Sequence, residues 1–109
     1  MAQIMIKNHT FFNSASTGAY SAELGLPAGA ECIKLEVSGT VDSITVEQMT
    51  DIEADVWQAV AGVAIASLSK VSSIAAAGSF LFPVAGCQKL RLHSTGTPGA
   101  CTVRGTVMG

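Results

Sequence analysis

The last third of the chain, residues 78–107, alternates apolar and polar side chains with the two-residue period of half-buried β-strands. Three segments carry this pattern: Gly78 to Val84, Lys89 to His93 and Ala100 to Val107. Within them, alternate positions are apolar, namely Phe80, Phe82, Val84, Leu90, Leu92, Cys101, Val103 and Val107. Because only a strand places such residues on one face, this stretch constrains the chain to a fold built around β-sheets.

The same period recurs upstream and predicts an all-β protein. Its most regular example is Glu31 to Ser38, where one face is apolar through Ile33, Leu35 and Val37. Further strands are predicted over 19–26, with Tyr20, Ala22, Leu24 and Leu26 on one face, and over 41–49. About eight short strands at intervals of roughly ten residues are typical of an antiparallel β-sandwich or jelly roll.

The chain of 109 residues fits a single domain. We expect residues 19–109 to form the sandwich. Residues 1–18 are predicted to be either an N-terminal arm that reaches a neighbouring subunit or an ordinary edge strand of the sheet. This segment holds four large apolar residues whose alternation is imperfect: Ile4, Ile6, Phe11 and Phe12.

The segment 54–68 is the most ambiguous part of the chain. Val56, Val60 and Val63 have helical spacing, so a short helix is one alternative. Gly62 interrupts that pattern, and the many Val, Ile and Ser residues favour strands. We therefore predict two strands, over 55–60 and 64–74, with a turn at residues 61–62.

A low charge content favours a homo-oligomer over an isolated monomer. Charged residues make up 13% of the chain, against about 25% in an average soluble protein, so much of the surface is suited to contact with neighbours. A net charge of −2 argues against nucleic-acid binding. Residues 1–7 lack the pattern of a signal peptide, and the apolar stretch 56–66 is too short to span a membrane, so we expect synthesis in the cytoplasm.

No combination of residues predicts catalysis, a metal or a cofactor. Cys32, Cys87 and Cys101 are odd in number and contain no CxxC pair, so we expect reduced, packed thiols. The only histidines, His9 and His93, lack the neighbours of a catalytic base. The chain is therefore not expected to be an enzyme.

The final two strands are predicted to form a hairpin that turns around residues 96–97. In that register Lys89 would face Arg104, and Arg91 would lie beside them on the polar face, giving one basic strip. Two interpretations are open. The strip contacts an acidic partner surface, or its side chains extend into solvent or pair with Glu31, Glu36 or Glu47 on a neighbouring strand.

Three carboxylates, Asp51, Glu53 and Asp55, follow the strand 41–49 with strand-like spacing. On one face they could bind a hard cation such as Ca²⁺. The segment lacks the glycine and the distal glutamate of an EF-hand loop, so a solvated acidic loop is the favoured interpretation.

The order of features resembles a β-sandwich module of small virion proteins of tailed bacteriophages, particularly capsid decoration (cement) and head-fibre proteins. The resemblance covers about residues 43–107 and rests on Asp55-Val-Trp57, Gly78-x-Phe-x-Phe-Pro-Val-x-Gly86, Leu90-Arg-Leu92 and Cys101-Thr-Val-Arg-Gly-Thr106. It implies a non-enzymatic, homotrimeric protein of the virion that binds the major capsid protein and stabilises the shell. The candidate contact residues are Ile4, Ile6, Phe11, Phe12, Lys89, Arg91 and Arg104.

A receptor- or carbohydrate-binding module of a fibre or tail is the alternative. Sugar sites use exposed aromatic rings beside polar groups, and the chain has one Trp, one Tyr and four Phe, several of which the core requires. Mutation of Trp57 distinguishes the two functions: loss of folding would indicate a core tryptophan, whereas an intact fold with lost glycan binding would indicate a carbohydrate-binding module.

Overall fold

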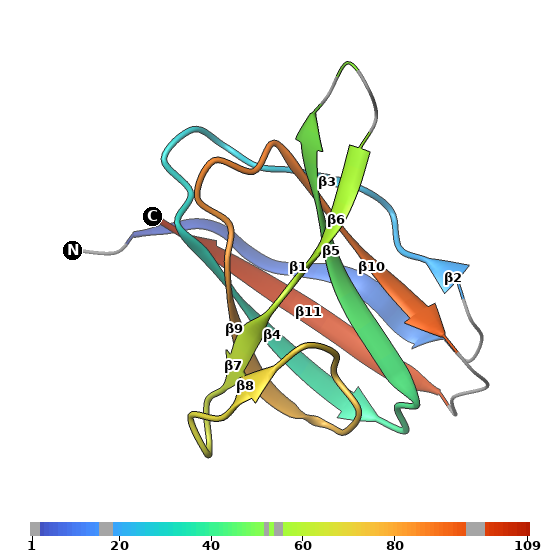
Figure 1. Cartoon of the computed structure of the whole chain (residues 1–109). Helices are drawn as coiled ribbons and strands as arrows, with labels where there is room; N and C mark the ends of the chain where they lie inside the picture. The colour runs from blue at the N-terminus through green and yellow to red at the C-terminus, as the bar shows by residue number, and fades with distance from the viewer. Residues whose placement is uncertain (1–2, 16–18, 52, 54–55, 96–99) are drawn as a thin grey trace.

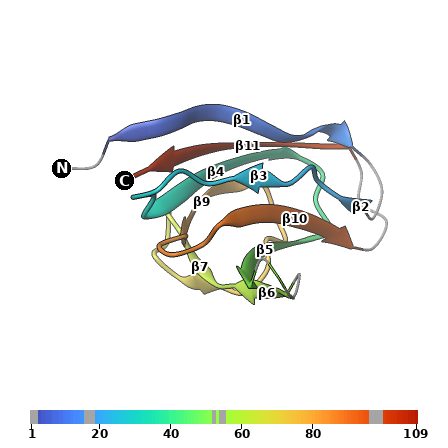
Figure 2. The same cartoon turned by 90° about the horizontal axis from the view of Figure 1, so that it is seen from above.

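The computed structural model describes residues 3–15, 19–51, 53, 56–95 and 100–109. These residues form two antiparallel β-sheets that pack face to face, and they include no helix (Figures 1 and 2). The predicted all-β antiparallel sandwich is confirmed. Seen from above in Figure 2, β1, β11 and β4 lie in one layer, with β10, β5 and β6 in the other.

The first sheet is six-stranded and the second is five-stranded. In spatial order, the first consists of β1 (Ile4–Ala15), β11 (Cys101–Met108), β4 (Cys32–Gly39), β9 (Gly78–Pro83), β7 (Gly62–Ala64) and β8 (Lys70–Val71). The second consists of β2 (Ala19–Tyr20), β10 (Lys89–Thr95), β5 (Ser43–Asp51) and β6 (Val56–Val60), with β3 (Leu24–Gly25) also paired to β10.

The core lies between the two sheets and follows the predicted alternation. Every second residue of β4, β10 and β11 is buried, and the fully buried side chains include Ile33, Leu35, Ile44, Val46, Ile74, Phe82, Leu90, Leu92, Val103 and Val107. Their burial removes a large apolar area from water, which is the main stabilising term for a domain of this size. The strand faces predicted from the sequence are therefore correct in these three strands.

The predicted hairpin between the last two strands is wrong. β10 pairs with β5, β2 and β3, whereas β11 pairs with β1 and β4. Both strands still direct their apolar residues into the core, because Leu90 and Leu92 face it from one sheet, and Cys101 and Val103 face it from the other. The alternation is the same for either arrangement, so it could not distinguish a hairpin from a crossing between sheets.

Two other segments differ from their predicted strands. Residues 19–26 form two short strands, β2 and β3, and Tyr20 faces outward while Leu24 is buried. Between them the buried Ser21 accepts a hydrogen bond from the Leu92 amide at 2.8 Å, and the alternation breaks at Ala22 and Glu23, which are both exposed. The predicted strand 64–74 is wrong, because this stretch holds only the end of β7 and the two-residue β8. The predicted turn at residues 61–62 is instead the point where the chain leaves one sheet for the other, between β6 and β7.

The segment 1–18 contains β1, which pairs along its length with β11 and forms one edge of the six-stranded sheet. Its register shifts four times, and Asn8 has a φ of 51°, so the edge is irregular. An irregular edge disfavours addition of a further strand. The start of β1 is tied to the end of the chain, since Gln3 and Gly109 exchange two backbone hydrogen bonds of 2.6 and 2.9 Å.

Candidate functional site

Phe11 and Phe12 are core residues, which corrects their expected role as partner contacts. They are 7% and 6% exposed, because a register shift between Thr10 and Phe12 lets both neighbours point inward. Ile4, by contrast, is 61% exposed and Ile6 is half-buried. Of the four apolar residues proposed for contact in β1, only these two reach the surface.

The three basic residues do not form one strip, because β10 and β11 belong to different sheets. Lys89 and Arg91 lie on the five-stranded sheet and Arg104 lies on the six-stranded sheet. Lys89 Nζ is 3.4 Å from Glu23 Oε1, and Arg91 Nε is 2.7 Å from Glu47 Oε1. Pairing with an acid on a neighbouring strand, one of the two interpretations of the sequence, is therefore the arrangement found for Arg91.

A set of side chains on the outer face of the five-stranded sheet surrounds Arg91, and we call it the arginine cluster: Tyr20, Glu47, Trp57, Arg91 and His93. Strand pairing brings them together from four strands, since His93 lies opposite Tyr20 and Arg91 opposite Glu47. Arg91 and His93 point outward because the alternate residues, Leu90 and Leu92, are buried in the core.

The guanidinium of Arg91 lies against two aromatic rings. Its Cζ atom is 4.2 Å from the centroid of the Tyr20 ring and 4.1 Å from that of Trp57. The His93 ring stacks on Tyr20 with a centroid distance of 4.1 Å and an interplanar angle of 12°. Together with the bond from Arg91 Nε to Glu47, these contacts hold the guanidinium from three directions, with cation–π attraction adding to the ion pair.

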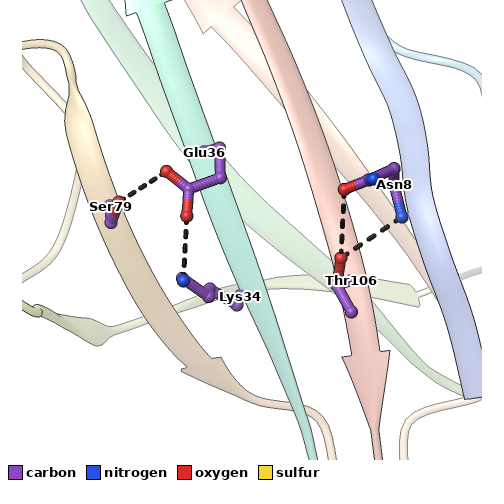
Figure 3. Close-up of polar contacts among 5 residues, drawn as sticks. All are labelled: Asn8, Lys34, Glu36, Ser79 and Thr106. Carbon is purple, nitrogen blue, oxygen red and sulfur yellow. Dashed lines mark hydrogen bonds and ion pairs between the residues drawn. The ribbon is translucent and has the colours of Figure 1, made fainter. Parts of the chain in front are cut away.

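The outer face of the six-stranded sheet carries smaller polar pairs (Figure 3). Glu36 accepts a hydrogen bond from Ser79 Oγ at 2.5 Å and lies 3.0 Å from Lys34 Nζ. The bond from Ser79 and the neighbouring Lys34 lower the pKa of Glu36. Across the sheet, the backbone amide of Asn8 donates to Thr106 Oγ1 at 3.2 Å. These pairs are solvent-exposed, so each contributes little to stability.

The three thiols are free, and none has the environment of a nucleophile. Burial raises the pKa of the Cys32, Cys87 and Cys101 thiols, which disfavours the reactive thiolate. Cys101 is buried on β11, whereas His93 lies on the outer face of the other sheet. The two residues therefore cannot act as a nucleophile and base.

The acidic segment proposed as a cation site lies partly outside the described residues, which include neither Asp55 nor the side chain of Asp51. Within the described part of the chain, no group of three His, Cys, Asp or Glu residues is placed to hold a metal ion. The described residues also include no helix long and apolar enough to cross a membrane.

Two hollows lie at the surface, and no residue of the arginine cluster lines either of them. One, of about 490 Å³, lies between loops 25–30 and 86–89. The other, of about 370 Å³, is a mostly apolar groove on the six-stranded sheet, lined by Cys32, Val63, Leu81, Pro83 and their neighbours. Neither contains a combination of side chains that suggests a particular reaction or ligand.

No protein-family model and no curated protein sequence matches the chain. Solved structures do match its fold. The SPBc2 prophage-derived protein YomS has a TM-score of 0.84 at 18% identity, covering 100% of this chain and 96% of that one. The PBSX exported protein XepA has a TM-score of 0.85 at 18% identity, covering 99% of this chain and 38% of that one. A mutant of CBM29-2, a family 29 carbohydrate-binding module, matches at a TM-score of 0.50 and 9% identity, covering 99% and 90%. The chain therefore shares the sandwich fold of two prophage proteins along its whole length.

Proposed function

We propose that this chain is a non-enzymatic structural protein of a bacteriophage particle, specifically a capsid decoration protein that binds the outer shell and stabilises it. The observation that carries this proposal is the fold shared over the full chain with two prophage proteins, one of them of similar length. The module resemblance noted in the sequence points to the same group of proteins. In this role the chain would be located on the virion.

Surface properties support a role in contact rather than in chemistry. Ile4 is 61% exposed, although a large apolar side chain gains free energy when it is covered. Phe11 and Phe12 are buried in the core of the sandwich, so Ile4 and the half-buried Ile6 are the residues of β1 proposed to contact the major capsid protein. Assembly as a homotrimer would let weak contacts act together on neighbouring capsid subunits.

Binding to capsids tests the proposal. Capsids of the phage or prophage that encodes the chain would be purified from a strain lacking it and mixed with the purified protein. We expect the protein to co-sediment with the capsids and to raise the temperature at which they release DNA. Native mass spectrometry of the free protein should give the mass of a trimer.

A pair of matched variants tests the contact surface. Ile4→Asp should weaken co-sedimentation by about tenfold or more if Ile4 is a central contact, whereas Leu68→Asp, which places the same charge at an exposed leucine outside β1, should not. A protein that stays monomeric and shows no affinity for these capsids would overturn the decoration role. Unchanged co-sedimentation of Ile4→Asp would remove β1 as the contact surface while leaving the role intact.

A further inference from the structure

We propose that the arginine cluster is a binding site for a neutral carbohydrate, an activity that goes beyond attachment to a capsid. The cluster lies on the outer face of the five-stranded sheet, apart from β1 and the exposed Ile4. A protein bound to a shell through β1 could therefore present this face to a second ligand.

The chain does not need the cluster to complete its core. All four phenylalanines, Phe11, Phe12, Phe80 and Phe82, are buried between the sheets, while the only tyrosine and the only tryptophan of the chain lie on the outer face. Tyr20 remains 53% exposed even though Arg91 and His93 both contact its ring. Aromatic residues kept outside a core and still accessible are typical of recognition surfaces.

Arg91 is held in place before any ligand arrives. Its side chain is only 21% exposed and that of Glu47 is 18% exposed, and the 2.7 Å bond between them ties the guanidinium to a residue of the neighbouring strand. The Tyr20 and Trp57 rings restrict it further. A prearranged site loses less side-chain entropy on binding, so even a small ligand can gain measurable affinity.

The charges of the cluster favour a neutral ligand over an anion. Each cation on the outer face of β10 lies beside a carboxylate, Lys89 beside Glu23 and Arg91 beside Glu47, so no net positive charge is available for a phosphate or carboxylate. Arg91 donates its Nε–H to Glu47, and its two terminal nitrogens make no hydrogen bond to another described residue. Among the described residues they are donors without a partner, next to a carboxylate that accepts.

A carbohydrate matches this combination of groups. Each sugar hydroxyl both donates and accepts hydrogen bonds, so adjacent hydroxyls can bond to a guanidinium and to a carboxylate at the same time. The C–H groups on the face of a sugar ring are apolar and pack against aromatic side chains such as Tyr20.

Fluorescence offers a direct test, because Trp57 is the only tryptophan in the chain. The purified protein would be titrated with neutral oligosaccharides of glucose, mannose, galactose and N-acetylglucosamine, and with polygalacturonate and dextran sulfate as anionic probes. We expect a saturable change in emission with at least one neutral probe. Tyr20→Ala and Arg91→Ala should each weaken it by about tenfold or more, and calorimetry should give the same order of affinities.

The matched control is Arg104→Ala, which removes an exposed arginine from the outer face of the other sheet and should leave the affinity unchanged. Melting curves establish that each variant is folded. If Tyr20→Ala does not fold, Arg91→Ala alone tests the cluster. Absence of a saturable response to every neutral probe up to roughly 10 mM would overturn the proposal. So would binding of anionic probes alone, or unchanged affinity in both cluster variants.

Capsid co-sedimentation of the same variants separates the two proposals. Tyr20→Ala should bind capsids as the wild-type protein does, since the cluster lies away from Ile4. If Tyr20→Ala loses capsid binding and the wild-type protein binds no neutral probe, the cluster is a shell contact and the carbohydrate proposal is wrong. If the neutral probe binds while capsids do not, only the decoration role fails.

Discussion

Replacing Gly105 with alanine tests the packing beneath β1. Gly105 occupies a core-facing position of β11, and a Cβ atom built there would lie 2.8 Å from Phe11 Cε2 and 2.8 Å from Ile33 Cδ1. Favourable carbon–carbon contacts begin at about 3.5 Å, so each neighbour would have to withdraw by about 0.7 Å. Ile33 is fully buried and Phe11 nearly so, which leaves little room for that movement.

The expected loss follows from this crowding. Overpacking of a filled core costs about 1–3 kcal/mol, and the reduced flexibility of the unfolded chain on replacing glycine offsets about 0.4–1 kcal/mol of it. A net loss of about 1–2 kcal/mol should lower the Tm by about 4–16 °C, since each kcal/mol corresponds to about 4–8 °C in a domain of this size.

Calorimetry and urea denaturation of Gly105→Ala measure the effect, with Gly25→Ala as the control. A Cβ at Gly25 would meet no atom within 4 Å, so this change should alter stability by less than about 0.5 kcal/mol. In the double variant Gly105→Ala/Phe11→Leu, the smaller leucine side chain should relieve the clash and recover part of the stability lost in Gly105→Ala. A Tm at or above that of the wild-type protein would refute the packing of Phe11 over Gly105, and would return Phe11 to the candidates for partner contact.

Three further changes test other parts of the structure by denaturation or chemical labelling. Phe12→Ala should cost about 3–5 kcal/mol because it empties a core site, whereas Ile4→Ala should cost less than about 0.5 kcal/mol; similar losses would contradict the burial difference. Because the pKa of Glu36 is lowered in the folded protein, its bonds stabilise the fold above the unfolded pKa near 4.5, and this stabilisation is lost as the pH falls through the folded pKa. Glu36→Gln should therefore reduce the loss of Tm on acidification. Cys101 should react with thiol reagents only on unfolding, and rapid labelling of the native protein at pH 8 would contradict its burial and raised pKa.

The candidate site was only partly predictable from the sequence. The alternation in β10 predicts Arg91 and His93 on the polar face, and the sequence offers Glu47 as one of three acids that could pair with the basic residues. The local pattern predicts Tyr20 on the same face as Leu24, because it carries no signal of the break at Ala22 and Glu23. Its contact with Arg91 depends on the pairing of β2 with β10, which joins residues about 70 positions apart in the chain.

The sequence by itself determined which face of each long strand is buried, because a two-residue period in β4, β10 and β11 has only one low-energy orientation against a core. Only the tertiary structure decided which strands are neighbours. Leu90 and Leu92 bury equally well opposite Cys101 and Val103 in a hairpin or across a sandwich, so alternation cannot choose between those pairings. In the structure β10 is hydrogen-bonded to β5 and β11 to β4, so the two strands lie in different sheets. This pairing separates Arg91 from Arg104 and places Arg91 against Tyr20 and Trp57.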